Sequence, residues 1–406
     1  MARSVVFIIY LMARLISIAG AAATTLVVPV IVYTATNSAA ITGLVAGIGG
    51  VSYFAFGIPV GHIVDRWPRG PVLVICNLFR GLVLATIPLA ILLDGFSLPL
   101  LVTGLVATNV LFVATDAANA GALWTIVGVK QLQRANALVS GSAALVEIAA
   151  PLAAGIALGR ISAEDVFFVE AFAMVGSAFL LWSIRGRLDP ATREPREKLT
   201  WPAVFSGFVF VWKTRLVTQT TAAALFFALS EGLILGQLIV LISVRYGPEQ
   251  GASVVAQVYT AIALGSVLGS WVLTKVQFAR NSAFICSAAF LLAAICLVGV
   301  VLATSQLTLI VFMGVWAVPF VVVFVGAASL RQSLAEDRLQ GRVAIAGRLL
   351  TLGIGIPIGD GIGGLVSELV SVNLAYMVAV ALSVSASVVF AVLHVRILAR
   401  ERFVNE

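Results

Sequence analysis

The chain has 406 residues, of which 61% are hydrophobic and 11% are charged, and it carries a formal net charge of +7. A water-soluble protein of this size needs a more polar surface, so the composition excludes an ordinary soluble enzyme, a disordered chain and a collagen-like rod. In a soluble protein the positive charge would suggest nucleic-acid binding. In a chain this apolar we attribute it to basic residues on cytoplasmic loops, and we expect no nucleic-acid partner.

The hydrophobic runs predict twelve membrane-spanning helices in two sets of six. The first run resembles a signal peptide, but Arg14 interrupts it and the hydrophobicity continues to Tyr33, so we expect an uncleaved first span. The runs do not alternate as the strands of a membrane barrel do. The predicted spans lie at about 5–33, 40–63, 71–93, 97–117, 135–158, 165–184, 216–244, 252–274, 282–304, 306–330, 342–367 and 372–396.

Lysine and arginine are unequally distributed between the predicted loops. With the N-terminus inside the cell, 16 of them lie on the inner side, and only Arg160 and Arg245 lie on the outer side. Because basic residues accumulate on the cytoplasmic side of membrane proteins, we predict a multi-pass protein of the cytoplasmic (inner) membrane with both termini in the cytoplasm.

The longest polar stretch divides the chain near its middle. We expect a first six-helix bundle at residues 1–184 and a second one at residues 216–406. The cytoplasmic linker between them, residues 185–215, includes an apolar segment at 201–212 that predicts a short helix lying in the membrane interface.

Similar residues recur about half a chain apart. The pairs are Gly57 and Gly265, Gly61 and Gly269, Pro151 and Pro357, and the Leu-Gln pairs at 132–133 and 339–340. The predicted fold class is therefore an all-α membrane protein with two pseudo-symmetric six-helix bundles, which is an architecture of transporters.

The most specific motif follows the second predicted span. It contains Gly61, Asp65, Arg66 and Arg69, and it resembles the loop signature of the major facilitator superfamily at these four positions. The resemblance implies a twelve-helix transporter in which this motif latches the two bundles on the cytoplasmic side. A glycine permits close helix packing, and a carboxylate can accept hydrogen bonds from a helix end.

Two positions of this motif differ from the signature, and the arginines of the motif can pair with another carboxylate. Pro68 replaces the usual glycine, and Gly70 stands where a second basic residue is common. We expect Asp116, near the inner end of the fourth span, to pair with Arg66 or Arg69.

Further segments resemble the macrolide-efflux and enterobactin-exporter branch of that superfamily. Pro151 and Gly155 resemble the helix-bend motif that exporters carry in span five, although Ala150 replaces its first glycine. Many relatives have an acid after Gly20, where this chain has Ala21. The other similar segments are Ser17 with Gly20, residues 33–43, Arg80, residues 131–136 and residues 341–343.

Ionisable residues at membrane depth are costly and usually face a cavity or a partner. The resemblance places spans one, five, seven and eleven around the central cavity, so the candidates for the substrate or proton pathway are Arg14, Glu147, Glu231 and Asp360. Each has a structural alternative: the arginine can neutralise an acid, and the acids can bond across helices or cap irregular backbone. We expect Arg80 to be structural and Glu170 to lie at the membrane interface.

Together these features predict a secondary active transporter that exports a small amphiphilic compound, such as a drug or a siderophore, by alternating access and proton antiport. Glu147, Glu231 or Asp360 would carry the proton, and Arg14 would attract an anionic group of the substrate. We expect a functional monomer driven by the proton gradient, with no cofactor. The cysteines and histidines lack metal-ligand spacing, and no phosphate-binding glycine motif is present.

Other functions fit the sequence less well. A lipid or lysolipid transporter and a specific importer of the same fold are the first alternatives. A sensor or scaffold has no need of the loop motif or of buried charges. A membrane enzyme would need paired acid–base or nucleophilic groups near one membrane face, and the sequence shows no such group.

Overall fold

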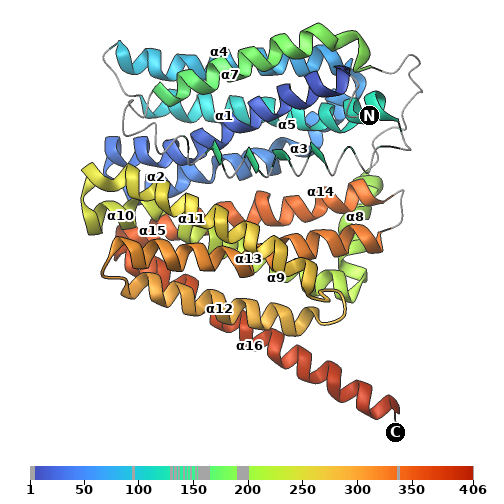
Figure 1. Ribbon diagram of the computed structural model, residues 1–406, viewed down its shortest axis with the longest axis vertical. Helices are drawn as coiled ribbons and strands as arrows, with labels where there is room; N and C mark the ends of the chain where they lie inside the picture. Colours follow the sequence, from blue (N-terminus) through green and yellow to red (C-terminus); the bar gives the residue numbers. More distant parts are fainter. Residues whose placement is uncertain are drawn as a thin grey trace. The chain divides into compact units, whose positions relative to one another are not determined.

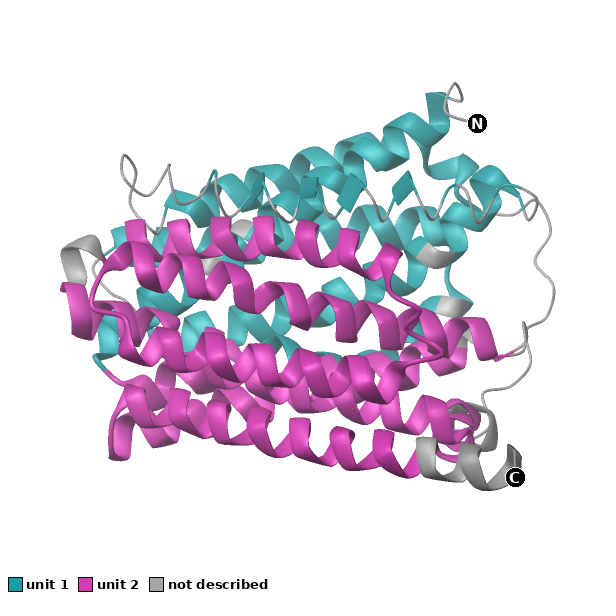
Figure 2. Cartoon of the chain, turned by 60° about the horizontal axis from the view of Figure 1, so that its bottom comes forward, with its two compact units in different colours: residues 1–37, 48–198 teal, residues 38–47, 199–406 magenta. Residues whose placement is uncertain are grey.

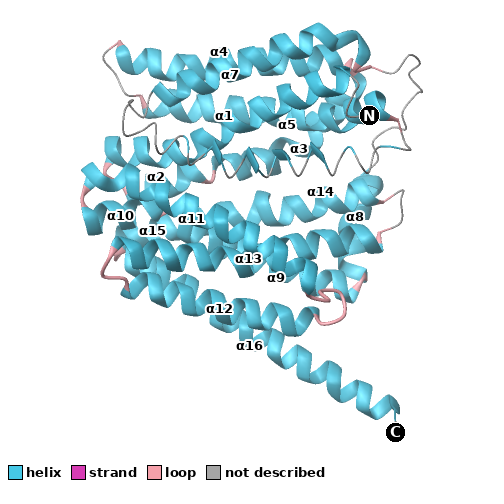
Figure 3. Cartoon of the chain, in the orientation of Figure 1, coloured by secondary structure: helices cyan, strands magenta, loops and turns pink. Residues whose placement is uncertain are grey.

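The computed structural model describes residues 5–93, 97–128, 165–189, 201–335 and 339–405, together with scattered positions between 131 and 153. Within these residues the regular elements are all helices (Figure 3). Long apolar runs form helices because a lipid environment offers the backbone no hydrogen-bonding partner. The predicted all-α fold class is confirmed.

The helices, which Figure 1 labels in chain order, form two compact units, coloured separately in Figure 2. Unit 1 comprises residues 1–37 and 48–198, and unit 2 comprises residues 38–47 and 199–406. The described elements of unit 1 are α1 (Val5–Thr36), α3 (Ile48–Arg66), α4 (Arg69–Leu92), α5 (Leu98–Val127), α7 (Asp165–Ile184) and the 3₁₀ turn η1 (Arg185–Arg187). Those of unit 2 are α2 (Ala39–Ala46), α8 (Trp201–Lys213), α9 (Arg215–Leu235), α10 (Leu238–Tyr246), α11 (Pro248–Lys275), α12 (Ser282–Leu302), α13 (Gln306–Leu334), α14 (Gln340–Arg348), the π-helix η2 (Leu349–Gly355), α15 (Ile356–Leu369) and α16 (Val372–Asn405).

Eleven helical segments in the described residues are long and apolar enough to cross a membrane, so the protein is a multi-pass membrane protein. Some of these segments join consecutive elements: α14, η2 and α15 together form the segment Arg342–Leu369. The eleven correspond to predicted spans, and the fifth predicted span, at 135–158, lies largely outside the described residues. The linker segment predicted to form a short helix does so as α8.

The two units repeat the same pairwise packing of helices. In unit 1, α3 packs against α5, and α4 packs against both α5 and α7. In unit 2, α11 packs against α13, and α12 packs against both α13 and α16. The repeated glycines Gly57 and Gly61 lie in α3, and their counterparts Gly265 and Gly269 lie in α11. The two repeated glycine pairs therefore lie in helices with corresponding packing partners.

Apolar side chains fill the interior of each unit and fix the helices that carry its polar residues. In unit 2, Phe227 stacks on Phe290 with ring centroids 4.1 Å apart, and Phe290 stacks on Phe390. In unit 1, buried side chains of α1, α4 and α5 form one cluster that includes Phe7, Leu73 and Ala118.

One short segment is grouped differently from the expected bundles. Residues 38–47, which include α2, are packed in unit 2, whereas the chain before and after them belongs to unit 1. Ser38 caps α2 by accepting a hydrogen bond from the backbone N–H of Ile41. The second predicted span is thus divided at Gly47 into α2 and α3.

Candidate functional site

The loop motif in unit 1 is organised around the start of α4. The guanidinium of Arg69 donates to the carbonyl oxygen of Gly121 at 2.8 Å and to the Thr125 hydroxyl at 2.9 Å. The backbone N–H groups of Arg69 and Gly70 donate to the Asp189 carboxylate, at 2.6 and 3.1 Å. Because Pro68 offers α4 no side-chain cap, Asp189 supplies the negative charge that a helix N-terminus favours.

The two glycines of this region differ in their surroundings. A Cβ at Gly70 would overlap the carbonyl oxygen of Arg185, which explains a glycine where the loop signature has a basic residue. Around the Cβ position of Gly61 there is open space, so the described residues do not show the close packing expected there. Arg66 lies 2.8 Å from the His62 ring nitrogen. Asp65 lies in α3, and its side chain is outside the described residues.

Arg14 of α1 and Asp116 of α5 form a half-buried ion pair. The guanidinium and carboxylate lie 3.7 Å apart, and each side chain is 25% exposed. This contact matches the structural alternative in which Arg14 neutralises an acid. A contact of Asp116 with Arg66 or Arg69 remains a prediction.

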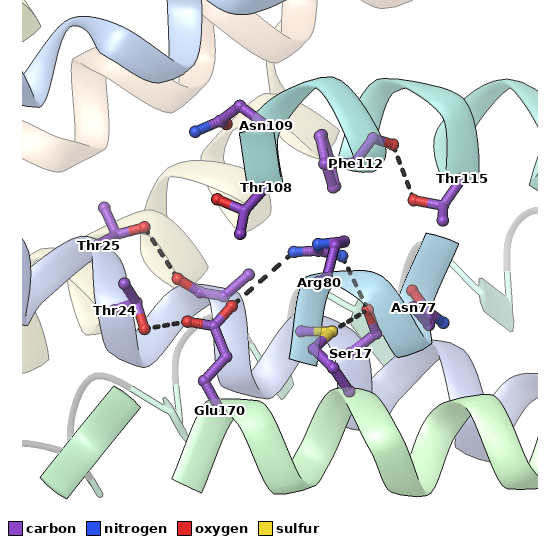
Figure 4. Close-up of polar contacts among 12 residues, drawn as sticks. Ser17, Thr24, Thr25, Asn77, Arg80, Thr108, Asn109, Phe112, Thr115 and Glu170 are labelled. Atoms are coloured by element: carbon purple, nitrogen blue, oxygen red, sulfur yellow. Dashed lines mark hydrogen bonds and ion pairs between the residues drawn. The ribbon is translucent and has the colours of Figure 1, made fainter. Parts of the chain in front are cut away.

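A second ion pair in unit 1 is buried. The Arg80 guanidinium of α4 lies 3.8 Å from the Glu170 carboxylate of α7, and both side chains are at most 5% exposed (Figure 4). Thr24 of α1 donates a hydrogen bond to the same carboxylate. The pair therefore joins three helices, with each charge compensated by the other.

Other residues of α1 and α5 complete this cluster. Arg80 donates to the Ser17 hydroxyl at 3.4 Å, and its guanidinium carbon lies 5.5 Å from the centre of the Phe112 ring (Figure 4). Gly20 leaves room for Glu170, because a Cβ there would lie 2.9 Å from its Cγ. Glu170 is buried among these helices, where Arg80 compensates its charge. Its expected position near the membrane interface stays a prediction. Arg80 is integral to the packing, as expected.

In unit 2, α9 and α15 approach closely along glycines spaced four residues apart. Gly232 lies on α9, and Gly236 is its C-cap. Gly355 ends η2 directly before α15, and Gly359 and Gly363 lie on α15. A Cβ at Gly232 or Gly359 would overlap backbone atoms of the opposite helix. Small residues at this spacing let helix backbones touch, so even a methyl group would separate α9 from α15.

Asp360 lies at the junction of α2, α9 and α15 and is 3% exposed. Its carboxylate packs against Gly236, the C-cap of α9, and its backbone carbonyl packs against Gly43 of α2. Glu231 of α9 interacts electrostatically with Asp360, and both charges act on Tyr259 of α11. The structure thus brings together two of the predicted pathway acids.

This acidic pair lacks the compensation that Glu170 has. Among the described residues no cation contacts Glu231 or Asp360, and one carboxylate oxygen of Glu231 is buried without a hydrogen-bond partner. Next to the pair, the amide of Gln237 donates to the carbonyl oxygens of Gly236 and Ala39, at 3.0 and 3.4 Å. Burying an uncompensated charge costs several kcal/mol, whereas a neutral acid is tolerated.

One of the arginines that the loop count places on the inner side is buried. Arg331 lies within α13, is 5% exposed, and donates to the Thr221 hydroxyl of α9 at 3.2 Å. Its guanidinium packs against Gly347 of α14, where a Cβ would lie 2.6 Å from Nε. The sequence places Arg331 at a predicted span end, and only packing shows that it turns inward.

Glu147, Pro151 and Gly155 lie outside the described residues. The described part of the chain contains no group of three or more side chains able to hold a metal ion.

Residues 10–351 match the family model described as Major Facilitator Superfamily. The chain belongs to the Major Facilitator Superfamily. A search among curated proteins returned no match.

Several solved transporter structures have a similar fold. A bacterial homolog of the human lysosomal transporter Spinster, inward-facing and occupied, has 16% identity, covers 97% of both chains and gives a TM-score of 0.76. A bacterial homologue of the iron transporter ferroportin has 16% identity over 97% of this chain and 100% of its own, with a TM-score of 0.71. The nucleoside transporter NupG has 12% identity over 96% and 99%, also with a TM-score of 0.71. At these identities the similarity shows the fold.

Membership in the Major Facilitator Superfamily identifies the chain as a transporter and not an enzyme. Unit 1 holds compensated ion pairs, whereas unit 2 holds two acids that no described cation contacts. Sequence reasoning missed the roles of Glu170 and Asp189, because the signal for each is a partner more than 80 residues away.

Proposed function

We propose that this protein is a proton-coupled antiporter that exports a small amphiphilic compound by alternating access between its two units. It acts as a monomer in the cytoplasmic membrane with both termini inside. The observation that carries this proposal is the uncompensated carboxyl pair of Glu231 and Asp360 in unit 2.

The physical argument starts from the cost of burial. Two neighbouring carboxylates repel each other, and no described cation offsets them. A proton is the smallest ligand that removes this penalty, and it has to be released once water reaches the site. A site that binds a proton when closed and releases it when open can couple proton entry to the transport cycle.

The candidate residues have separate roles in this proposal. Glu231 or Asp360 carries the proton, and Glu147 of the predicted fifth span is the third candidate. Arg14, which lies 3.7 Å from Asp116, attracts an anionic group of the substrate when the pair separates. The loop around Arg69 holds the inner ends of the helices, and Pro151 with Gly155, outside the described residues, is the candidate helix-bend motif of the predicted fifth span.

The first prediction concerns coupling. In proteoliposomes, Glu231→Gln and Asp360→Asn are each expected to lower transport driven by a pH gradient at least tenfold, because the amide cannot release a proton. Counterflow of labelled substrate, which needs no net proton movement, is expected to persist. Asp165→Asn, at the exposed start of α7, is the matched control and is expected to keep both activities.

Substrates for this assay come from a ligand-stabilisation screen that includes antibiotics, siderophores and lysolipids. A pH-driven transport rate that both amide variants retain would disprove the proton role of these acids. Stabilisation by lysolipids alone would favour the alternative of a lipid transporter.

A further inference from the structure

A carboxylate of α15 binds the N-terminus of α2. Glu368, near the end of α15, accepts hydrogen bonds from the backbone N–H groups of Ala39 and Ala40, at 2.7 and 3.3 Å, and from the Ser38 hydroxyl at 3.2 Å. The first N–H groups of a helix have no partner within the helix, and a negative charge is favourable there. Glu368 therefore fastens α2 by three hydrogen bonds and by charge.

The rest of α2 lies antiparallel to α15 with little side-chain volume between them. Gly364 packs against Ala39 and Ala40, Gly43 packs against the backbone of Asp360 and Gly364, and Gly47 packs against Pro357. Helices that meet through glycines do not interdigitate large side chains. Such a contact can be opened without first unpacking a core.

The contact between α2 and α15 involves a short segment of unit 2 whose neighbours on either side in the chain are helices of unit 1. Residues 38–47 are packed in unit 2, while α1 before them and α3 after them belong to unit 1. Movement of the two units against each other, as the proposed alternating access requires, therefore either carries α2 away from α15 or holds the movement back.

We propose that Glu368 is a positioning residue of the transport cycle, a latch that holds α2 on α15 in one conformation and releases it in another. The proposal rests on alternating access but not on proton coupling. Glu368 is exposed, so water can replace its three hydrogen bonds when α2 leaves, which makes release reversible.

The latch adjoins the acidic pair. Asp360 lies two helical turns before Glu368 on α15, and Gly43 of α2 packs against its backbone. The amide of Gln237 also contacts α2 and the end of α9, because it donates to the carbonyl oxygens of Ala39 and of Gly236, the C-cap of α9. A change in the charge of Asp360 thus acts directly on the surface that α2 occupies.

The test measures a distance and needs no substrate. Spin labels replace Leu44 of α2 and Leu365 of α15, both exposed, in a background in which the buried cysteines are replaced by alanine. Electron paramagnetic resonance then gives the populations of near and separated helices in lipid nanodiscs. Removing a helix-capping charge is worth about 1 kcal/mol, so Glu368→Gln is expected to raise the separated population roughly 3- to 10-fold.

Two further variants make the test specific. Ser371→Ala removes a cap of α16, where Ser371 accepts from the N–H of Leu374, and it is expected to leave the distances unchanged. If Glu368→Gln does not fold, Glu368→Asp, with its shorter reach, is expected to shift the population in the same direction.

An unchanged distance distribution in both Glu368 variants, or an equal shift in Ser371→Ala, would overturn the latch. Proton coupling is assessed separately by the Glu231 and Asp360 variants. A distance shift in Glu368→Gln together with intact proton-driven transport in those variants would keep the latch and reject the proton role.

Discussion

At the scale of single residues, the main contrast lies between compensated and uncompensated buried charges. Glu170 has Arg80 and Thr24 as partners, whereas Glu231 and Asp360 have each other. Compensation makes a buried charge a permanent part of the packing. Its absence makes a carboxyl group responsive to water and protons.

The second prediction follows from the Arg80–Glu170 pair. Removing one member leaves an unpaired buried charge, so Arg80→Met is expected to lower the free energy of unfolding by about 3 kcal/mol or more. Arg80→Met combined with Glu170→Met is expected to recover most of that loss. Denaturation in detergent, followed by tryptophan fluorescence, supplies the double-mutant cycle.

If the losses of unfolding free energy caused by Arg80→Met and Glu170→Met simply add in the double variant, the two side chains have no coupling energy, and the predicted ion-pair effect is contradicted. Glu170→Gln is also expected to keep the pH dependence of transport, in contrast to Glu231→Gln.

At the scale of elements, glycines decide which helices touch. On α15 they occur on different faces: Gly359 packs against Leu229 of α9, Gly364 packs against α2, and Gly361 has open space at its Cβ position. Within α15, Gly359 in a close contact can therefore be compared with Gly361, which has no neighbour at its Cβ position.

The third prediction uses this comparison. Gly359→Ala is expected to destabilise unit 2 by about 1–3 kcal/mol, because its methyl group meets the Leu229 carbonyl and pushes α9 away. Gly361→Ala is expected to stabilise the protein slightly, because alanine favours the helix. Thermal unfolding of both variants measures the difference, and equal melting temperatures would show that the helices are not in close contact.

The elements also show what the sequence could predict. Hydropathy located the described spans, since each long apolar run must form its own helix in lipid. It could not assign residues 38–47 to unit 2, because the glycine contacts of Gly43 and Gly47 join residues more than 300 positions apart. Likewise, local sequence placed Glu170 near a span end, and only its distant partner Arg80 shows that it is buried.

At the scale of the whole molecule, the chain consists of two units with separate cores. The acids Glu231 and Asp360 were singled out by depth in the membrane, but their proximity depends on how α9 packs against α15. Repetition of the helix pairing in both units was detectable from the glycine spacing. Glycine spacing could not show that Glu170 in unit 1 is paired with a cation while Glu231 and Asp360 in unit 2 are not paired with any described one.

The fourth prediction follows from this division. Fragments 1–189 and 201–406, expressed together, are expected to assemble and to bind a stabilising ligand, because the cut leaves every described helix intact. Co-purification through a tag on one fragment measures assembly. A cut inside α9, between Phe226 and Phe227, is the control and is expected to abolish assembly. Failure of the linker cut to assemble would mean that the linker itself holds the units together.

The π-helix η2 has a consequence for the movement of α15. It lies between α14 and α15, immediately before the segment that carries both Asp360 and Glu368. A π turn holds one residue more than an α turn, and each residue of an α-helix advances the chain by about 100° and 1.5 Å. If η2 tightens to α geometry, α15 rotates about its own axis by roughly that angle. One backbone rearrangement would then turn Asp360 away from Gly236 and withdraw Glu368 from α2 at the same moment, so proton release and unlatching would share a single screw-like motion.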